Sequence, residues 1–347
     1  MAGVSTPSLA AEVSNAGGLG ALGLGATKPE QARALIAEVR ARTDRPFNVN
    51  LFVHSAPKAD AEREARWLDW LNPFFAEYDE IPPEKLSSPY TSFLDDPAML
   101  ALLLEVKPPV ISFHFGLPPA VCMTALKQTG AVLLATVTSP AEALSAEAAG
   151  MDAVIAQGVE AGGHRGMFDP HAPDDALGTF PLVRLLSCQC HGPVIAAGGI
   201  MDGAGLAAAL DLGAVAAQMG TAFLLCPETG LDEAYRKALI GQAVFHTRMV
   251  SLISGRPARG LANRFTALAD RPDAPPCPDY PIAYDAGKAL AKAARTHGEA
   301  GFDAHWAGQG APLARALPAG RLVREIQAEY MEILKQRSHQ ITRAGLV

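Results

Sequence analysis

Residues 153–166 read AVIAQGVEAGGHRG, a short apolar run followed by a glycine-rich segment that carries one histidine. The apolar run Ala153–Ala156 predicts a buried strand. In parallel α/β proteins, ligands bind on the loops that follow the carboxyl ends of strands, and paired glycines let backbone N–H groups approach a ligand closely. A histidine in such a loop, here His164, is suited to proton transfer near neutral pH. The alternative is a glycine-rich turn with an exposed histidine.

Short apolar runs of the same kind recur along the chain and alternate with helical patterns. This alternation is typical of a parallel sheet with helices on its faces, and continuous apolar strands fit burial on both faces. The predicted strands are 19–23, 48–53, 110–115, 131–137, 153–156, 194–197 and 214–219, and the principal helices are 29–42, 97–105, 118–128, 140–149, 180–188 and 204–212.

Seven strands predict a TIM-like (β/α)8 barrel that lacks one strand, because a closed barrel of this kind has eight. The first recognisable element is a helix that Thr6 caps and Pro7 opens. The missing strand is therefore expected to be the first. Either the sheet is open, or the chain lacks the opening segment that the architecture requires, which leaves two unpaired edges.

Residues 1–227 are predicted to form the barrel, with an excursion at 54–97 that is first charged and then proline-rich. Beyond residue 227 the pattern becomes helical, so residues 228–347 are predicted to form a C-terminal helical subdomain that packs on the barrel. Its predicted helices are 231–243, 284–296 and 320–337, with turn-rich links at 254–263 and 271–281.

The composition excludes several classes of function. A formal net charge of −7 and a pI near 5.7 provide no basic surface for nucleic acid or acidic membranes. No apolar run reaches the roughly 18 residues of a membrane span, and no signal peptide is visible. The five scattered cysteines indicate reduced thiols in a cytoplasmic protein. Cys188 and Cys190 have no second half-site at zinc spacing, so no metal centre is predicted.

Two further strands end in glycine. Residues 194–200 read VIAAGGI and residues 217–223 read AQMGTAF. They are the last two strands in chain order, and the loops after the last two strands are where TIM barrels bind phosphate through backbone N–H groups. Thr221 adds a hydroxyl. Gly18–Gly23 comes near the dinucleotide-binding pattern G-x-G-x-x-G, but its glycines do not follow a strand and open a helix. The phosphate is therefore expected to belong to a mononucleotide cofactor or a phosphorylated substrate.

Polar side chains at the other strand ends are expected to surround the same mouth of the barrel. His164 is the better candidate for a general base, because it lies in the glycine-rich loop, whereas His114 is as readily a packed or hydrogen-bonded residue. Asparagine and glutamine amides can bind the edge of a heteroaromatic ring or satisfy backbone groups instead. The polar residues at these ends are Asn48, Asn50, Ser112, His114, Thr136, Thr138 and Gln157.

The C-terminal region carries a second candidate surface. Tyr284 and Lys288 are four residues apart and share a helix face, and Tyr280 precedes the turn that begins this helix. They form either a wall of phenols and an ammonium that closes over an anionic substrate, or ordinary amphipathic tyrosines beside a solvated lysine.

Several of these segments together resemble the nitronate monooxygenases, formerly called 2-nitropropane dioxygenases, and in particular their bacterial class I. The resemblance extends from Met1 to about Lys292, and the order and spacing of its segments are more specific than any single motif. The segments that carry it are Ala2–Pro7, Asn15–Gly20, Gln157–Gly166, Ala197–Ile200 and Gln218–Thr221.

The resemblance implies a TIM-like barrel with non-covalently bound FMN, and it assigns site residues by matching motifs. The family's catalytic base falls on His164. The flavin-binding positions fall on Asn50, Gln157, Gly162, Gly199, Gln218, Met219, Gly220 and Thr221. The substrate-pocket positions fall on Tyr90, His114, Tyr280, Tyr284 and Lys288.

The implied reaction is the oxidation of an alkyl nitronate, such as propionate 3-nitronate, by O2 to a carbonyl compound and nitrite, without nicotinamide. His164 is expected to take the α-proton of a neutral nitroalkane, and Lys288 and the tyrosines to hold the anionic substrate. The family carries a longer segment before the position of Met1, which forms the first barrel strand. That departure agrees with the count of seven strands and predicts a truncated or internally started chain.

Three other functions remain open. A flavin reductase of the same superfamily, acting on NADH and quinone or on an enoyl thioester, would oxidise NAD(P)H rapidly. The alternative outside enzymes is a barrel that binds flavin or phosphate and catalyses no reaction. An aldolase-like barrel is disfavoured, because none of the seven strands carries a Schiff-base lysine. The preferred nitronate, the physiological role and the choice between monomer and homodimer stay open.

Overall fold

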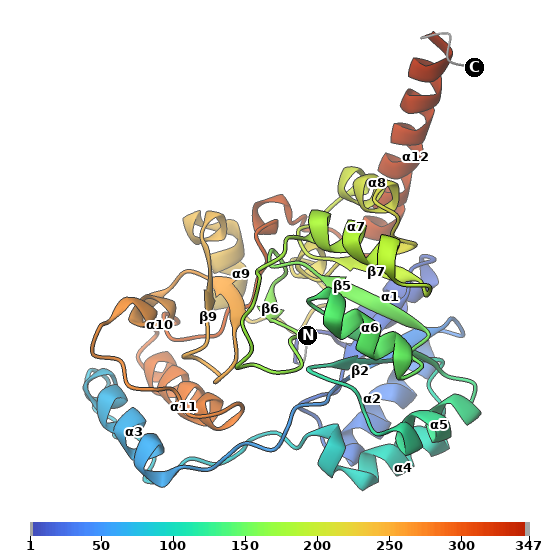
Figure 1. Ribbon diagram of the computed structural model, residues 1–347. Helices are drawn as coiled ribbons and strands as arrows, with labels where there is room; N and C mark the ends of the chain where they lie inside the picture. The colour runs from blue at the N-terminus through green and yellow to red at the C-terminus, as the bar shows by residue number, and fades with distance from the viewer. Residues whose placement is uncertain (1–2, 344–347) are drawn as a thin grey trace.

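Seven parallel strands form one curled sheet in the computed structural model, which describes residues 3–343 (Figure 1). The sheet order is β1-β2-β3-β4-β5-β7-β8, which follows the chain except that β6 (Gly163–His164) belongs to a different sheet, and β1 and β8 form the two ends. This half-barrel confirms the predicted TIM-like class. The strands are β1 (Gly20–Gly23), β2 (Phe47–Phe52), β3 (Val110–His114), β4 (Val132–Val137), β5 (Ala153–Gln157), β7 (Val194–Ala197) and β8 (Ala216–Gln218).

Four of the seven helices that cover the sheet begin at a residue whose side chain caps them. The Thr6 side chain accepts a hydrogen bond from the Leu9 N–H, and Ser139 caps another helix in the same way. Proline occupies the first turn of four of these helices, where its missing N–H costs nothing. They are α1 (Pro7–Asn15), α2 (Pro29–Arg42), α4 (Pro97–Val106), α5 (Ala120–Gln128), α6 (Pro140–Ala148), α7 (Thr179–Gln189) and α8 (Gly203–Asp211).

Successive side chains of a strand point to opposite faces of the sheet, so one half of them faces the helices and the other half faces the inside of the half-barrel. Val49 and Leu51 of β2 belong to the large core that the strands share with the helices. Asn48 and Asn50, on the opposite face of β2, both donate to the Ser112 hydroxyl at 2.8 Å. The polar residues predicted at the strand ends therefore point into the half-barrel rather than toward the helices.

A second, smaller lobe lies to one side of the sheet (Figure 1). Helix α3 (Ala61–Ala76), from the predicted excursion, shares a hydrophobic core with α11 (Ile282–Thr296), although more than two hundred residues separate them in the chain. Trp67, Leu71 and Phe75 of α3 pack in this core with Leu290 and Phe302. We therefore propose that the excursion belongs with the C-terminal lobe rather than with the barrel.

The predicted C-terminal region is wrong in one respect, because it is not purely helical. β9 (Thr247–Val250) and β10 (Ala258–Leu261) form an antiparallel pair, and β6 (Gly163–His164) adds to β10 as a third strand. The sequence predicts a turn-rich link at 254–263, which β10 contradicts. β9 and β10 are both short, and an arginine interrupts each of them. A glycine also interrupts β10, so neither of these two strands has a recognisable apolar pattern.

Two terminal helical predictions also differ from the structure. The predicted helix 231–243 is α9 (Glu233–Ile240) followed by a separate 3-10 turn (Gln242–Phe245), because Gly241 divides them. The last helix, α12 (Ala319–Arg343), extends beyond the predicted end at residue 337. It packs on the barrel, where Leu322 and Ile326 share a core with Leu9, and Gly203 of α8 leaves room for the close approach of Glu329. α10 (Arg264–Ala267) completes the second lobe.

Met1, Ala2 and residues 344–347, which the predicted domain boundaries include, lie outside the described residues. Within the described part of the chain, no helix is long and apolar enough to cross a membrane.

Candidate active site

His164 lies on β6, and the pairing of β6 with β10 fixes its backbone opposite Ala258. The Gln157 side chain, at the end of β5, donates from Nε2 to the His164 carbonyl oxygen at 2.9 Å and accepts from the Gly166 N–H at 2.7 Å. His114 Nε2 lies 3.1 Å from the same carbonyl oxygen. Both side chains are therefore engaged in holding the loop that carries His164, and His114 carries its proton on Nε2 because a carbonyl can only accept.

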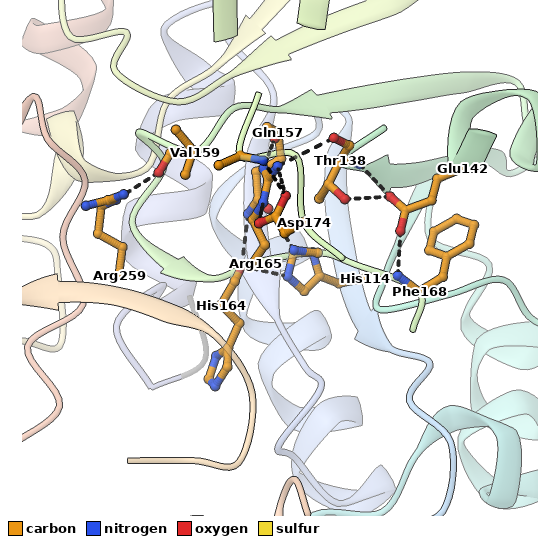
Figure 2. Close-up of polar contacts among 12 residues, drawn as sticks. His114, Thr138, Glu142, Gln157, Val159, His164, Arg165, Phe168, Asp174 and Arg259 are labelled. Carbon is orange, nitrogen blue, oxygen red and sulfur yellow. Dashed lines mark hydrogen bonds and ion pairs between the residues drawn. The ribbon is translucent and has the colours of Figure 1, made fainter. Parts of the chain in front are cut away.

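Arg165 fixes the other side of this loop (Figure 2). Its guanidinium is buried and bonds both oxygens of Asp174, at 2.9 and 3.0 Å, and also the Gln157 carbonyl oxygen. Arg259 donates to the Val159 carbonyl oxygen at 2.8 Å. In Figure 2 the His164 ring points away from this network of backbone contacts. The loop is thus rigidly held while the imidazole remains available to a ligand.

The His164 ring lies among aromatic side chains from the second lobe. The ring centroids of Tyr280, Tyr284 and Trp306 are 5.3, 6.2 and 5.3 Å from that of His164. Burial lowers the pKa of His164 to about 3, and the neighbouring His114 and Arg256 act in the same direction. The imidazole is therefore neutral at physiological pH, which is the form that accepts a proton.

Ser254 engages one nitrogen of the His164 ring. The Ser254 hydroxyl oxygen lies 2.9 Å from His164 Nε2 and 3.2 Å from the Arg256 carbonyl oxygen. Nδ1 of His164 forms no hydrogen bond with any residue from 3 to 340, so it is the ring nitrogen left to face a ligand.

Tyr90, Tyr284 and Lys288 form a second part of the same wall. Lys288 Nζ lies 4.3 Å from the centre of the Tyr90 ring and 5.0 Å from that of Tyr284. Burial lowers the pKa of Lys288, and Asp285 opposes this shift. Asp285 accepts from the Ser87 N–H and hydroxyl, both at 2.8 Å, so the excursion that carries Tyr90 is tied to α11. The five predicted pocket residues and His164 are therefore brought together.

The glycine-ended loops after β7 and β8 leave backbone donors free. No oxygen among residues 3–343 accepts a hydrogen bond from the N–H groups of Gly199, Gly220 or Thr221. Gly199 has φ +69°, the left-handed region that favours glycine, and a Cβ at Gly220 would meet no atom within 4 Å. Exposed N–H groups in this arrangement form a cradle for an anion such as a phosphate.

Other predicted cofactor positions have partners within the chain. Ala307 and Gly308 lie so close to position 162 that only glycine fits there. A Cβ added to Gly162 would lie 2.4 Å from the Gly308 nitrogen. Thr221 Oγ1 accepts from the Gly308 N–H at 3.0 Å. Gln218 and Met219 lie at the end of β8, one end of the parallel sheet, beside the free N–H groups.

Comparison with known proteins agrees with this geometry. The family model described as nitronate monooxygenase matches residues 1–329. The chain belongs to the nitronate monooxygenase family.

Two relatives and one solved structure show how far the similarity to this family extends. The chain is 60% identical to a nitronate monooxygenase of Paraburkholderia phytofirmans, covering 97% of this chain and 92% of the relative. It is 55% identical to a nitronate monooxygenase of Pseudomonas aeruginosa, covering 95% and 94%. A nitroalkane oxidase from Streptomyces ansochromogenes superposes with a TM-score of 0.87 at 41% identity, covering 96% and 94%. The chain is thus an oxidoreductase of a flavoprotein family.

Several residues around this candidate site are not predicted from the sequence. Ser254 and Arg256 lie in the stretch read as a turn-rich link, and Trp306 has no periodic pattern near it. His54 directly follows the predicted strand 48–53, so its position at a strand end is a signal that identifies it. The sequence predicts Phe115 only as the last residue of a strand, but its φ of +78° marks a strained backbone beside the site.

We expect the free energy of unfolding to fall as the pH drops below about 6.5, the ordinary value for histidine. Burial lowers the pKa of four histidines, to about 4 for His114 and about 3 for His164, and also for His54 and His305. The unfolded chain then binds more protons, so stability is complete above the unfolded pKa and is lost toward the folded values, by up to about 1.4 kcal/mol per pH unit for each histidine.

Urea unfolding at about pH 7 and about pH 5 measures this effect. His114→Gln should reduce the difference between the free energies of unfolding at the two pH values. His171→Asn, a change at an exposed loop position, should leave this difference unchanged. A free energy of unfolding that does not change between these pH values would contradict the burial of neutral imidazoles.

Proposed function

We propose that this chain binds FMN and oxidises alkyl nitronates with O2, giving a carbonyl compound and nitrite, with propionate 3-nitronate as a representative substrate. The observation that carries the proposal is the His164 imidazole, kept neutral and surrounded by Tyr280, Tyr284 and Trp306, in a chain that belongs to the nitronate monooxygenase family. In each nitronate the C–N bond breaks, nitrogen leaves as nitrite, and the carbon gains one oxygen atom. Two nitronates consume one O2, so that both of its oxygen atoms end in carbonyl groups.

The free backbone donors support the choice of FMN. The N–H groups of Gly199, Gly220 and Thr221 suit a terminal phosphate, and the space over Gly220 admits it. When bound, FMN supplies the electron acceptor for the nitronate and the group that reacts with O2. Of the remaining proposed positions, Asn50, Gln218 and Met219 would contact the cofactor directly. Gln157 and Gly162 would shape its pocket through the loop contacts described above.

The role proposed for His164 is proton transfer at Nδ1. A neutral nitroalkane must lose its α-proton before it can be oxidised as a nitronate, and a neutral imidazole within hydrogen-bond reach performs such a step. Ser254 holds Nε2 and keeps Nδ1 free. A substrate supplied as the nitronate needs no deprotonation, so His164 then only helps to hold the anion.

Lys288 is proposed to hold the distal carboxylate of substrates such as propionate 3-nitronate. We expect Lys288→Met to lower kcat/KM for propionate 3-nitronate by about 10- to 100-fold, the loss of one charge-assisted hydrogen bond. Turnover of an alkyl nitronate without a carboxylate should change little. Lys335, exposed on α12, provides the control variant Lys335→Met. Equal losses for both substrates would contradict a role in carboxylate binding.

The proposed partners are small molecules, a nitronate and O2. The five cysteines are all free thiols, which supports a cytoplasmic protein.

Oxygen uptake and nitrite release with propionate 3-nitronate test the proposed function, with NADH as the competing substrate. The proposal expects both signals with the nitronate and no rapid oxidation of NADH. Rapid oxidation of NADH without nitrite release would favour the flavin reductase of the same superfamily. Bound flavin without either reaction would favour a binding protein.

A further inference from the structure

Three buried polar atoms beside His164 have no hydrogen-bond partner. They are Arg256 Nη1, His54 Nε2 and the Tyr280 hydroxyl, and the side chains that carry them are only 3, 3 and 5% exposed. A buried polar atom without a partner costs about 1–3 kcal/mol, more when it is charged. Three such atoms in one place indicate that a ligand belongs there.

The three side chains gather around one ring, that of Phe115. The Arg256 guanidinium carbon lies 4.2 Å over the ring centre, and the Tyr280 and His54 centroids are 5.3 and 6.5 Å from it. His54 and Tyr280 also touch edge to face at 5.0 Å. His164 lies 5.6 Å from the same ring. Phe115 itself has φ +78°, a strained backbone conformation for a residue other than glycine.

The charge of Arg256 indicates the charge of the missing ligand. It forms no ion pair with any residue from 3 to 340, and its one side-chain hydrogen bond is from Nη2 to the Phe168 carbonyl oxygen at 3.2 Å. The charges of two carboxylates, Asp169 and Glu142, act on Arg256, but neither forms an ion pair with it. Glu142 is engaged by Thr138 and by the Phe168 N–H. Asp169 accepts from the His171 N–H. A guanidinium stays charged, and a buried charge without a counter-ion is strongly unfavourable. The missing group is therefore an anion.

We propose that Arg256 and Tyr280, with His54 as the third wall, form a subsite for a small oxyanion with two oxygens on one atom, the head group of a nitronate or the nitrite that leaves. The naming of this anion rests on the proposed function; the existence of the subsite does not. Nη1 and the tyrosine hydroxyl supply hydrogen-bond donors for separate oxygens. His54 Nδ1 donates to the Ser55 carbonyl oxygen at 3.1 Å, and burial lowers the pKa of the ring, so Nε2 is an acceptor. His54 therefore bounds the subsite without donating a hydrogen bond to the anion.

This assignment divides the recognition of a substrate between two cations. Arg256 holds the nitrogen end next to His164, deep in the aromatic cluster. Lys288, which lies against Tyr90 and Tyr284, holds the far end. A substrate that carries both a nitronate and a carboxylate is then bound at each end by a separate positive charge.

Isothermal titration of sodium nitrite into the protein as purified tests the subsite, with sodium chloride at equal ionic strength as the reference. We expect the wild type to bind nitrite and Arg256→Met to bind it at least about tenfold more weakly. Arg248→Met is the matched control, because Arg248 is paired with Asp270 on the outside of the same hairpin. Nitrite binding by this variant should equal that of the wild type. Equal affinity in Arg256→Met, or no nitrite binding by the wild type, would overturn the proposal.

Tyr280→Phe keeps the test decisive if Arg256→Met does not fold, since it removes only a hydroxyl. Weaker nitrite binding supports the subsite, and unchanged binding overturns it. A second explanation is that Arg256 binds the cofactor, and flavin content measured by absorbance tests it. If Arg256→Met loses FMN and keeps its affinity for nitrite, the guanidinium binds the cofactor and the proposal is overturned. Nitrite binding that needs Arg256, in a protein that does not oxidise nitronates, leaves the subsite standing and removes only the proposed function.

Discussion

Replacement of His164 by asparagine is expected to lower kcat/KM for neutral nitroalkanes by about 10²- to 10⁴-fold, the usual contribution of a general base. Oxidation of preformed nitronates should fall much less, because their α-proton is already absent. Asparagine keeps a polar side chain of similar reach but has no basic nitrogen. The main-chain contacts of residue 164 with Gln157 and His114 do not involve the imidazole, so the loop should keep its shape.

Initial rates with a nitroalkane and with its nitronate, measured on the same preparation, give the ratio that this prediction concerns. His171→Asn, in an exposed loop, is the control and should leave both rates unchanged. If His164→Asn lowers the two rates equally, His164 binds the anion or supports the site and is not the base.

Aspartate at position 220 is expected to produce a folded protein that has lost most of its affinity for FMN. A Cβ at Gly220 meets no atom within 4 Å and the residue has φ −104°, so a side chain is accommodated without strain. Its carboxylate would lie beside the proposed phosphate. Two unit charges about 4 Å apart repel by about 4 kcal/mol at an effective dielectric constant of about 20, which is nearly 10³-fold in affinity.

Gly220→Asn is the matched control, because asparagine has the same shape as aspartate and no charge. Flavin fluorescence titration of the apoprotein measures FMN affinity for both variants, and thermal unfolding shows whether both are folded. Equal FMN affinity in the aspartate and asparagine variants would mean that the phosphate does not lie at the end of β8.

The sequence predicted the half-barrel well because local signals determine it. Most sheet strands are short, largely apolar runs, and residues such as Thr6, Pro29 and Ser139 mark where helices begin. The period-two alternation also explains why Asn50 and Gln157 face inward. These features need only neighbouring residues, which is why they could be read without coordinates.

The second lobe depends on contacts that no local pattern reports. Tyr90 reaches Tyr284 only because α3 and the excursion pack on α11, far away in the chain. The pairing of β6 with β10, which fixes His164, depends on two residues of a very short strand. Motif resemblance supplied the pocket residues, but it identified neither Ser254 nor Arg256, whose importance appears only when their hydrogen bonds and burial are known.

The most direct test of the account is an absorption spectrum of the purified protein, recorded without oxygen before and after addition of propionate 3-nitronate and, separately, of NADH. The account predicts flavin bands that bleach with the nitronate and do not respond to NADH. Rapid, complete bleaching by NADH without a response to the nitronate would contradict it, as would a folded protein that shows no flavin bands and takes up none from added FMN.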